Sequence, residues 1–130
     1  MRWLAAGERE LEGACGEGFL QGILLSEVSA PCRVAATERR IVLFEDGATD
    51  RRGRTRPGTI SLEVPWSKVH AYWTGVVPFP PDMWREGHEG DVIMFTLDPD
   101  AADGRDIVVF PRTEAWLAAV RAMGVPELVD

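Results

Sequence analysis

The stretch RVAATERRIVLF, from Arg33 to Phe44, decides the fold class of this chain. It consists of two short runs with strand character, Arg33–Ala36 and Ile41–Phe44, on either side of the polar break Thr37-Glu-Arg-Arg40. Two such runs around a polar turn are typical of a β-hairpin. The stretch therefore predicts two antiparallel strands, and the rest of the chain repeats this pattern.

Further short runs separated by turn signals lie on both sides of the hairpin. Phe19–Val28 is apolar and is followed by the turn-prone Ser-Ala-Pro sequence. Ile60–Val64 alternates between apolar and polar residues, as half-buried strands do. The remaining predicted strands are Val69–Thr74, Asp91–Leu97 and Asp106–Phe110. With the hairpin, these runs predict seven strands.

Two segments do not have the pattern of a regular strand. Asp46–Gly58 is rich in Gly, Asp, Arg and Pro, and this composition predicts a loop. Arg2–Gly13 fits either a short helix or a leading strand. Gly13, Gly16 and Gly18 follow closely and indicate a turn before the first strand.

The last element has the period of a helix. Apolar residues recur on one helical face at Trp116, Leu117, Val120 and Met123. Thr113 is a suitable N-cap, and Gly124 is a suitable left-handed stop. The pattern predicts a helix over Glu114–Met123.

Seven short strands followed by one amphipathic helix predict a mainly β protein. We expect an antiparallel barrel or sandwich whose open end is covered by the helix. A chain of 130 residues fits one domain, and it is long enough to bury a core without disulfides or metals. The domain is therefore expected to span residues 1–130.

Charge and cysteine usage restrict the partners and the compartment. The formal net charge is −7, which disfavours binding to nucleic acid and to anionic membranes. No apolar run approaches the roughly 18 residues of a membrane span, and the N-terminal run is shorter than a secretory signal. The two cysteines are too few for a disulfide framework. We expect a cytoplasmic protein with no nucleic-acid partner and no stable membrane association.

Three separate pieces carry a family resemblance: Gly7-Glu8-Arg9, the Arg33–Phe44 hairpin, and Val64-Pro-Trp-Ser-Lys-Val69. In their order and spacing they resemble bacterial pleckstrin-homology-like and GRAM-like domains, over about Gly7 to Val125. The resemblance implies a single seven-stranded barrel of two packed antiparallel sheets, capped by the C-terminal helix. It also implies a non-enzymatic scaffold that binds lipids, peptides or proteins.

The only basic cluster falls in the predicted loop and consists of Arg51, Arg52, Arg54 and Arg56. Four guanidinium groups can hold a phosphate through bidentate bonds, or attract an acidic protein partner. In the resembled fold this loop shares a rim with the connection that carries Asp98, Asp100, Asp103 and Asp106. These carboxylates would largely cancel the field. A solvated loop paired with the aspartates is the competing interpretation.

The stretch HAYWTGVVPFPPDMWREGHEG, from His70 to Gly90, departs from the resembled family. It adds an insert at about residues 75–90 between predicted strands five and six, and loops of this length are usually functional or disordered. Alternation predicts that Trp73 points inward and that His70 and Tyr72 point outward. Candidate partner contacts are Tyr72, Phe79, Met83 and Trp84. Phe79, Met83 and Trp84 either cover an apolar gap in the barrel or stay exposed and anchor a partner.

No residue pattern indicates a catalytic site, a metal site or a cofactor. The histidines, His70 and His88, have no ligand spacing to Cys15 or Cys32, whereas a zinc site needs three or four convergent ligands. A Cys–His nucleophilic pair can form only in space, so the sequence leaves a small hydrolase or an enzyme accessory subunit open.

The sequence favours a non-enzymatic interaction domain that binds a protein or peptide partner through the aromatic and proline-rich insert. The exposed sheet edge beside the insert is a second contact for the same partner. A barrel that holds a small apolar molecule or a lipid is the alternative. A homodimer through an open sheet edge is also left open.

Overall fold

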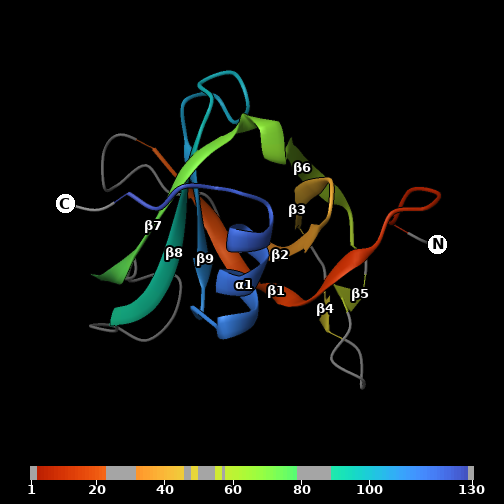
Figure 1. Ribbon diagram of the computed structural model, residues 1–130, viewed down its shortest axis with the longest axis horizontal. Helices are drawn as coiled ribbons and strands as arrows, with labels where there is room; N and C mark the ends of the chain where they lie inside the picture. Colours follow the sequence, from red (N-terminus) through yellow and green to blue (C-terminus); the bar gives the residue numbers. More distant parts are fainter. Residues whose placement is uncertain are drawn as a thin grey trace.

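The computed structural model describes residues 3–22, 32–45, 48–49, 55–56, 58–78 and 89–128. This part of the chain is mainly β, with seven antiparallel strands in one curled, half-barrel sheet and one C-terminal helix (Figure 1). The strands of the sheet are β1 (Glu10–Gln21), β2 (Cys32–Thr37), β3 (Arg40–Phe44), β6 (Ile60–Pro65), β7 (Val69–Pro78), β8 (Glu89–Leu97) and β9 (Asp106–Phe110). The other elements are the short strands β4 (Ala48–Thr49) and β5 (Thr55–Arg56), the 3₁₀ turn η1 (Trp66–Lys68) and the helix α1 (Glu114–Ala122).

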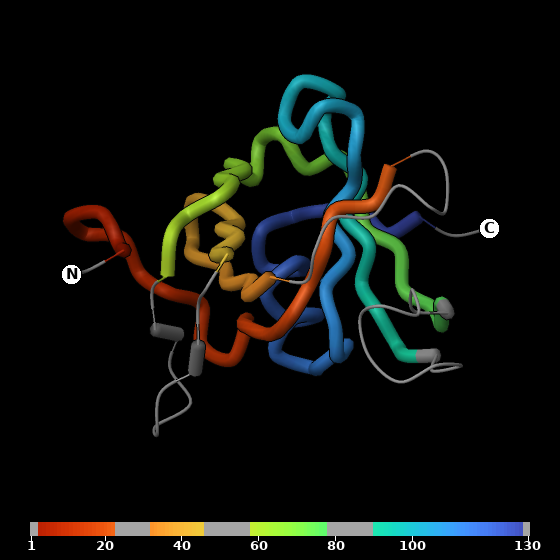
Figure 2. The backbone as a smooth tube through the Cα atoms, turned by 180° about the vertical axis from the view of Figure 1, so that it is seen from behind, coloured from red at the N-terminus to blue at the C-terminus, as the bar shows by residue number. Residues whose placement is uncertain are grey.

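The strands follow the order β6-β3-β2-β1-β9-β8-β7 across the sheet. The long strand β1 lies at the centre and pairs with β2 on one side and β9 on the other. The two edges of the sheet are β6 and β7, which η1 connects along the chain. Figure 2 shows the curl from behind. The finer arrangement as two packed sheets of a barrel stays a prediction.

The main hydrophobic core lies between the curled sheet and α1. Trp116 and Val120 of α1 are fully buried, and the Trp116 ring lies 6.0 Å from Phe95 of β8. Phe95 in turn contacts Trp66 of η1 at a ring distance of 6.2 Å. Burying each such large side chain stabilises the fold by roughly 1.5–3 kcal/mol. The core therefore fastens α1 to the sheet.

The prediction of the C-terminal helix is confirmed. Thr113 caps the helix, because its Oγ1 accepts a hydrogen bond of 3.2 Å from the backbone N–H of Trp116. The chain leaves the helix through Gly124, whose φ of 74° lies in the left-handed region that glycine tolerates. Among the described helices, none is long and apolar enough to cross a membrane.

The predicted turn at Gly13, Gly16 and Gly18 is wrong, because all three lie inside β1. A Cβ atom on Gly18 would lie 2.5 Å from the carbonyl oxygen of Val108, and one on Gly16 would lie 2.8 Å from that of Phe110. These glycines therefore allow β9 to approach β1 closely. The leading-strand alternative holds from Glu10 onward, while residues 23–28 of the predicted first strand lie outside the described residues.

The predicted orientations of Tyr72 and Trp73 are also wrong. Tyr72 is buried in the main core, whereas Trp73 packs on the opposite face of the sheet beside Phe19. The cause is a register shift between Val69 and Ala71, which places one extra residue in β7 and reverses the alternation after it. His70 is exposed, as predicted.

Two segments contain more strand than the sequence predicts. Within the predicted loop, β4 and β5 pair through Ala48↔Arg56 and Thr49↔Thr55. At the predicted insert, β7 and β8 remain paired out to Pro78↔Glu89, so both ends of the insert belong to the sheet. The remaining connection, residues 79–88, lies outside the described residues.

Candidate functional site

The residues predicted to contact a partner lie mostly outside the part of the chain that the structure describes. Phe79, Met83 and Trp84 lie there, as do Arg51, Arg52 and Arg54. Arg56 belongs to β5, but only its backbone is described. The ring of Tyr72 is in the core at 3% exposure and cannot serve as an exposed anchor. Of these predicted partner contacts, the described residues therefore include only Tyr72, whose ring lies in the core.

The backbone of Tyr72 instead marks the outer edge of the sheet. Its N–H donates a hydrogen bond of 3.0 Å to the carbonyl oxygen of Pro126, and its carbonyl oxygen accepts one of 2.8 Å from the N–H of Leu128. The C-terminal segment Pro126–Leu128 thus pairs with β7 at this point, in the parallel direction. One side of β7 pairs with β8, and the other side is an edge that the chain itself uses.

Beyond Tyr72 this edge has unpaired backbone groups. Because the N–H and C=O groups of a strand alternate between its two sides, Thr74 and Val76 direct theirs to the same side as Tyr72. Within the described residues, no hydrogen bond reaches these groups from outside the sheet. Pro78 has the same parity and carries no N–H, as is usual for proline on an edge strand.

Apolar side chains flank the unpaired groups on both faces of β7. Val76 is 57% exposed, and Leu128 of the C-terminal segment is 51% exposed. On the opposite face, Trp73 and Val77 are partly buried against the apolar cluster of Phe19, Val92, Val108 and Phe110. A Cβ atom on Gly75 would lie 2.4 Å from the Trp73 ring, so the indole lies along the strand over this glycine.

The other edge strand of the sheet, β6, carries exposed polar side chains and a proline. Ser61, Glu63 and Pro65 are all exposed. The Ser61 hydroxyl donates to the carbonyl oxygen of Leu43, and Glu63 pairs with Arg40. Charged residues and proline on an edge strand oppose pairing with another chain. Of the two edges, β7 is the one suited to receive a further strand.

An ionic network centred on the buried carboxylate of Glu8 joins pieces of the sequence that lie far apart along the chain. The side chain of Glu8 is 1% exposed, and its carboxylate forms a bidentate pair with the Nε and Nη2 of Arg40, at 2.9 and 2.7 Å. The same carboxylate accepts hydrogen bonds from the Thr37 hydroxyl at 2.6 Å and the Ala5 N–H at 2.9 Å. All strong acceptor positions of Glu8 are therefore used.

The network fixes the charge state of both partners. The hydrogen bonds from Arg40, with those from Thr37 and Ala5, lower the pKa of Glu8 to about 2, although burial acts in the opposite direction. The hydrogen bond to Glu8 raises the pKa of Arg40. The Arg40 guanidinium also donates to the carbonyl oxygen of Trp3 at 2.9 Å and lies 5.8 Å from the centre of the Trp3 ring. Both charges persist at neutral pH, and we assign the network a structural role.

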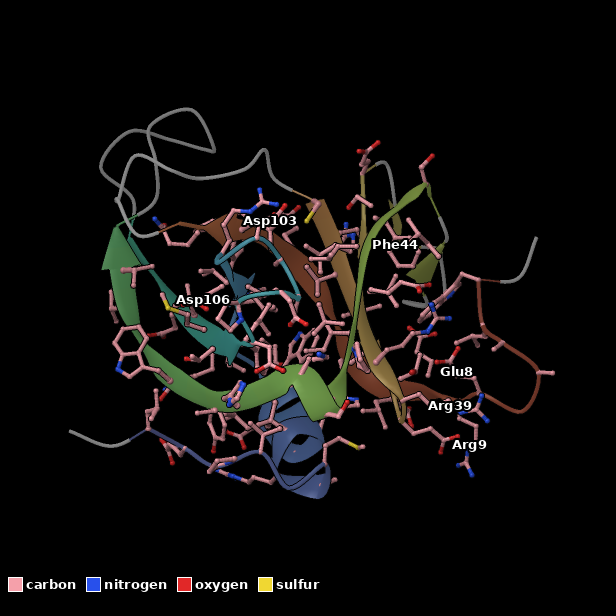
Figure 3. All side chains as sticks on the ribbon, turned by 90° about the horizontal axis from the view of Figure 1, so that it is seen from above. Glu8, Arg9, Arg39, Phe44, Asp103 and Asp106 are labelled. Carbon is pink, nitrogen blue, oxygen red and sulfur yellow. The ribbon has the colours of Figure 1, made fainter. Side chains whose placement is uncertain are left out.

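A cavity of about 330 Å³ opens beside this network. It is lined by Ala5, Glu8, Arg39, Arg40, Glu63 and Pro65. Figure 3 shows Arg9 and Arg39 close to Glu8, at the end of the β2–β3 hairpin. Arg39 is exposed, and no described residue forms a hydrogen bond or an ion pair with its guanidinium. The cavity therefore offers unused donors.

The described thiols and imidazole do not form a catalytic arrangement. Cys32 donates its S–H to the carbonyl oxygen of Gly18 at 3.4 Å, and burial raises the pKa of its thiol to about 11. A protonated thiol is a poor nucleophile at neutral pH. His70 pairs with Asp98 on the surface, and this hydrogen bond lowers the pKa of Asp98. Within the described ranges, no three His, Cys, Asp or Glu side chains gather as a metal site would need.

No protein-family model and no curated protein matches this chain. The sequence prediction missed the pairing of the C-terminal segment with β7, for which the sequence carries no signal. It also missed the Glu8–Arg40 pair, although the Gly-Glu opening and the Thr-Glu-Arg-Arg turn supplied complementary charges.

Proposed function

We propose that this chain is a non-enzymatic interaction domain that binds an extended peptide segment of a protein partner, by adding it as a strand to the outer edge of β7. The observation that carries the proposal is that no described residue pairs with the outward N–H and C=O groups of Thr74 and Val76. It lies directly beyond Tyr72, where the C-terminal segment already pairs with the same edge. Unpaired edge groups flanked by apolar side chains are a template for another strand.

The energetics indicate a moderate affinity. Four backbone hydrogen bonds at Thr74 and Val76 would contribute about 1 kcal/mol each, less than the cost of association. The partner must therefore also bury apolar surface on Val76 and on the Trp73 face. A binding free energy near −8 kcal/mol corresponds to a dissociation constant of about 1 μM. We expect partner segments that alternate apolar residues, because alternate side chains of an added strand face Trp73 and Val77.

The connection that follows β7 is proposed to add contacts to the same partner. It begins immediately after Pro78, at the end of the unpaired edge, and carries Phe79, Met83 and Trp84. Aromatic side chains concentrate binding energy once a partner excludes water. The proposed membership of the pleckstrin-homology-like family is supported by the seven strands, the curl of the sheet and the C-terminal helix.

The alternatives have less support in the geometry. A small apolar ligand between α1 and the sheet would compete with Trp116, Phe95 and Trp66, which fill that space. A thiol hydrolase would need a reactive cysteine, and burial disfavours the thiolate of Cys32. The peptide-binding proposal needs no rearrangement of the core.

The test is to select binders from a library of extended peptides and to map them by NMR on the full chain. The amides of Thr74 and Val76 should shift most, with dissociation constants in the micromolar range. Val76→Pro removes the outward N–H without touching the ladder to β8 and should weaken binding at least about tenfold. Val76→Thr retains the N–H and serves as the control. Binders that map elsewhere, or that bind the Val76→Pro variant equally well, would refute the proposal.

A further inference from the structure

The cavity beside Glu8 has an excess of hydrogen-bond donors. Arg40 uses its Nε–H and both Nη2 hydrogens on Glu8 and Trp3, and it uses one Nη1 hydrogen on Glu63. One Nη1–H of Arg40 is left over. The five N–H groups of Arg39 have no acceptor among the described residues. Glu8 cannot accept these additional N–H groups, because all its acceptor positions are occupied. A ligand that completes the site must therefore supply a hydrogen-bond acceptor.

The backbone holds Arg39 in place at the cavity. Its N–H donates to the Thr37 hydroxyl at 3.1 Å, and its carbonyl oxygen accepts from the N–H of Trp66 at 3.3 Å. The guanidinium lies over Gly7, where a Cβ atom would be 3.9 Å from Nη2. Gly7 has a φ of 76°, a conformation that residues other than glycine rarely adopt, so the backbone conformation beneath the guanidinium favours glycine. The Arg39 side chain is thus attached to a backbone turn that hydrogen bonds already fix, and this lowers the conformational entropy lost when a ligand binds.

Charge and size restrict the ligand. The lining holds two guanidinium groups and two carboxylates, and both carboxylates, those of Glu8 and Glu63, pair with Arg40, so the lining is nearly neutral in total. A nearly neutral lining with spare donors suits a monoanion better than a phosphate dianion, and the net charge of −7 opposes polyanions further. The volume of about 330 Å³ is at the small end for ligand sites, and Ala5 and Pro65 supply apolar walls. A planar carboxylate on a short carbon stem matches these properties, and the guanidinium fork binds it bidentately.

We propose that this cavity is a carboxylate-binding site in which Arg39 is the principal ligand and the spare N–H of Arg40 is the second donor. The site is independent of the β7 edge, because the two share no residue. The carboxylate comes either from a small organic acid or from an acidic side chain of a partner peptide. The chemistry is the same in both cases, and the experiment distinguishes them.

The experiment titrates the full chain, labelled with ¹⁵N, with sodium acetate and separately with a short blocked peptide that contains one glutamate. Sodium chloride at matched ionic strength serves as the reference. The Arg39 Nε–H signal should shift saturably, with a dissociation constant on the order of millimolar for acetate. Tighter binding of the peptide assigns the carboxylate to a partner, and equal binding assigns it to a small acid.

Matched variants make the proposal falsifiable. Arg39→Gln should weaken binding about tenfold or more, and Arg39→Lys should recover only part of it, because an ammonium group cannot form the bidentate fork. Arg121→Gln, which removes an exposed arginine from α1, should bind as the unaltered chain does. Urea unfolding should show that Arg39→Gln remains as stable as the unaltered chain. Absence of a saturable shift with both probes, or undiminished binding by Arg39→Gln, would overturn the assignment.

Discussion

Replacing Glu8 with Gln tests the ionic network directly, because it removes the charge and preserves the shape. A fall in pKa from the ordinary 4.5 to about 2 corresponds to roughly 3 kcal/mol of stability at neutral pH. The Glu8 carboxylate is buried, but its partner Arg40 is partly exposed and solvent screens the pair, so we take about 2 kcal/mol as the expected loss. With a urea dependence near 1.5 kcal/mol per molar, the unfolding midpoint should fall by about 1–1.5 M.

The pH dependence separates charge from packing. Glu8 has a depressed folded-state pKa, so its contribution is complete above about pH 5 and is lost as the pH falls toward 2. The difference in unfolding free energy between the unaltered chain and Glu8→Gln should therefore shrink to less than about half by pH 3. Arg40→Met should cost more, roughly 3–5 kcal/mol at pH 7, because it leaves the Glu8 carboxylate buried without its partner.

The control is Glu12→Gln, which changes an exposed carboxylate of β1 that forms no ion pair or hydrogen bond with any described residue. Its midpoint should stay within about 0.3 M of the unaltered chain, since exposed charges contribute little. Two results would defeat the reasoning. One is a Glu8→Gln midpoint that matches this control at pH 7. The other is a loss of equal size at pH 7 and pH 3, which would assign the effect to packing.

Three further predictions concern the strand contacts, the helix cap and the thiol. Gly18→Ala should lower the free energy of unfolding by at least about 3 kcal/mol or prevent folding, because the new Cβ meets the Val108 carbonyl at 2.5 Å; a melting temperature close to that of the unaltered chain would contradict this. Thr113→Ala should cost about 1 kcal/mol in urea unfolding through loss of the cap to Trp116, and no measurable loss would count against it. Cys32 should react with iodoacetamide far more slowly than free cysteine up to pH 9, by peptide mapping, because burial raises the pKa of its thiol to about 11; fast alkylation at pH 7 would exclude the buried, protonated thiol.

The elements that the sequence predicted correctly are those specified by their own residues. The Arg33–Phe44 hairpin carries both strands and its turn in one stretch, and the helix from Glu114 carries its cap and its apolar face. The glycines of β1 required knowledge of β9, because Gly18 is needed only where the Val108 carbonyl approaches. A glycine that makes room for a distant strand has the same local signature as a glycine in a turn. Sequence patterns alone favour the turn.

The same limit applies to the candidate contact surfaces. Alternation along β7 assigned Tyr72 outward because nothing local marks the extra residue between Val69 and Ala71, which is defined by the register with β8. The pairing of Leu128 with Tyr72 depends on where α1 releases the chain, which is a tertiary property. The apolar character of Trp73 and Val77 was visible in the sequence, but their position beside an unpaired edge was not.

The adjacent residues Arg39 and Arg40, at the end of the β2–β3 hairpin, have different roles. Arg40 pairs with Glu8 and Glu63 and donates to the Trp3 carbonyl, so its charge mainly stabilises the fold. Arg39 shares the Thr37-anchored turn and lines the same cavity, but none of the described residues accepts a hydrogen bond from its guanidinium. The saturation of Glu8 by Arg40 is what leaves Arg39 free, because an unsatisfied Glu8 would attract the neighbouring guanidinium into the network. A ligand site at Arg39 is therefore a consequence of the structural pair. Arg39→Gln removes the principal ligand and leaves the pair intact, whereas a change of Arg40 affects both the pair and the second donor of the site.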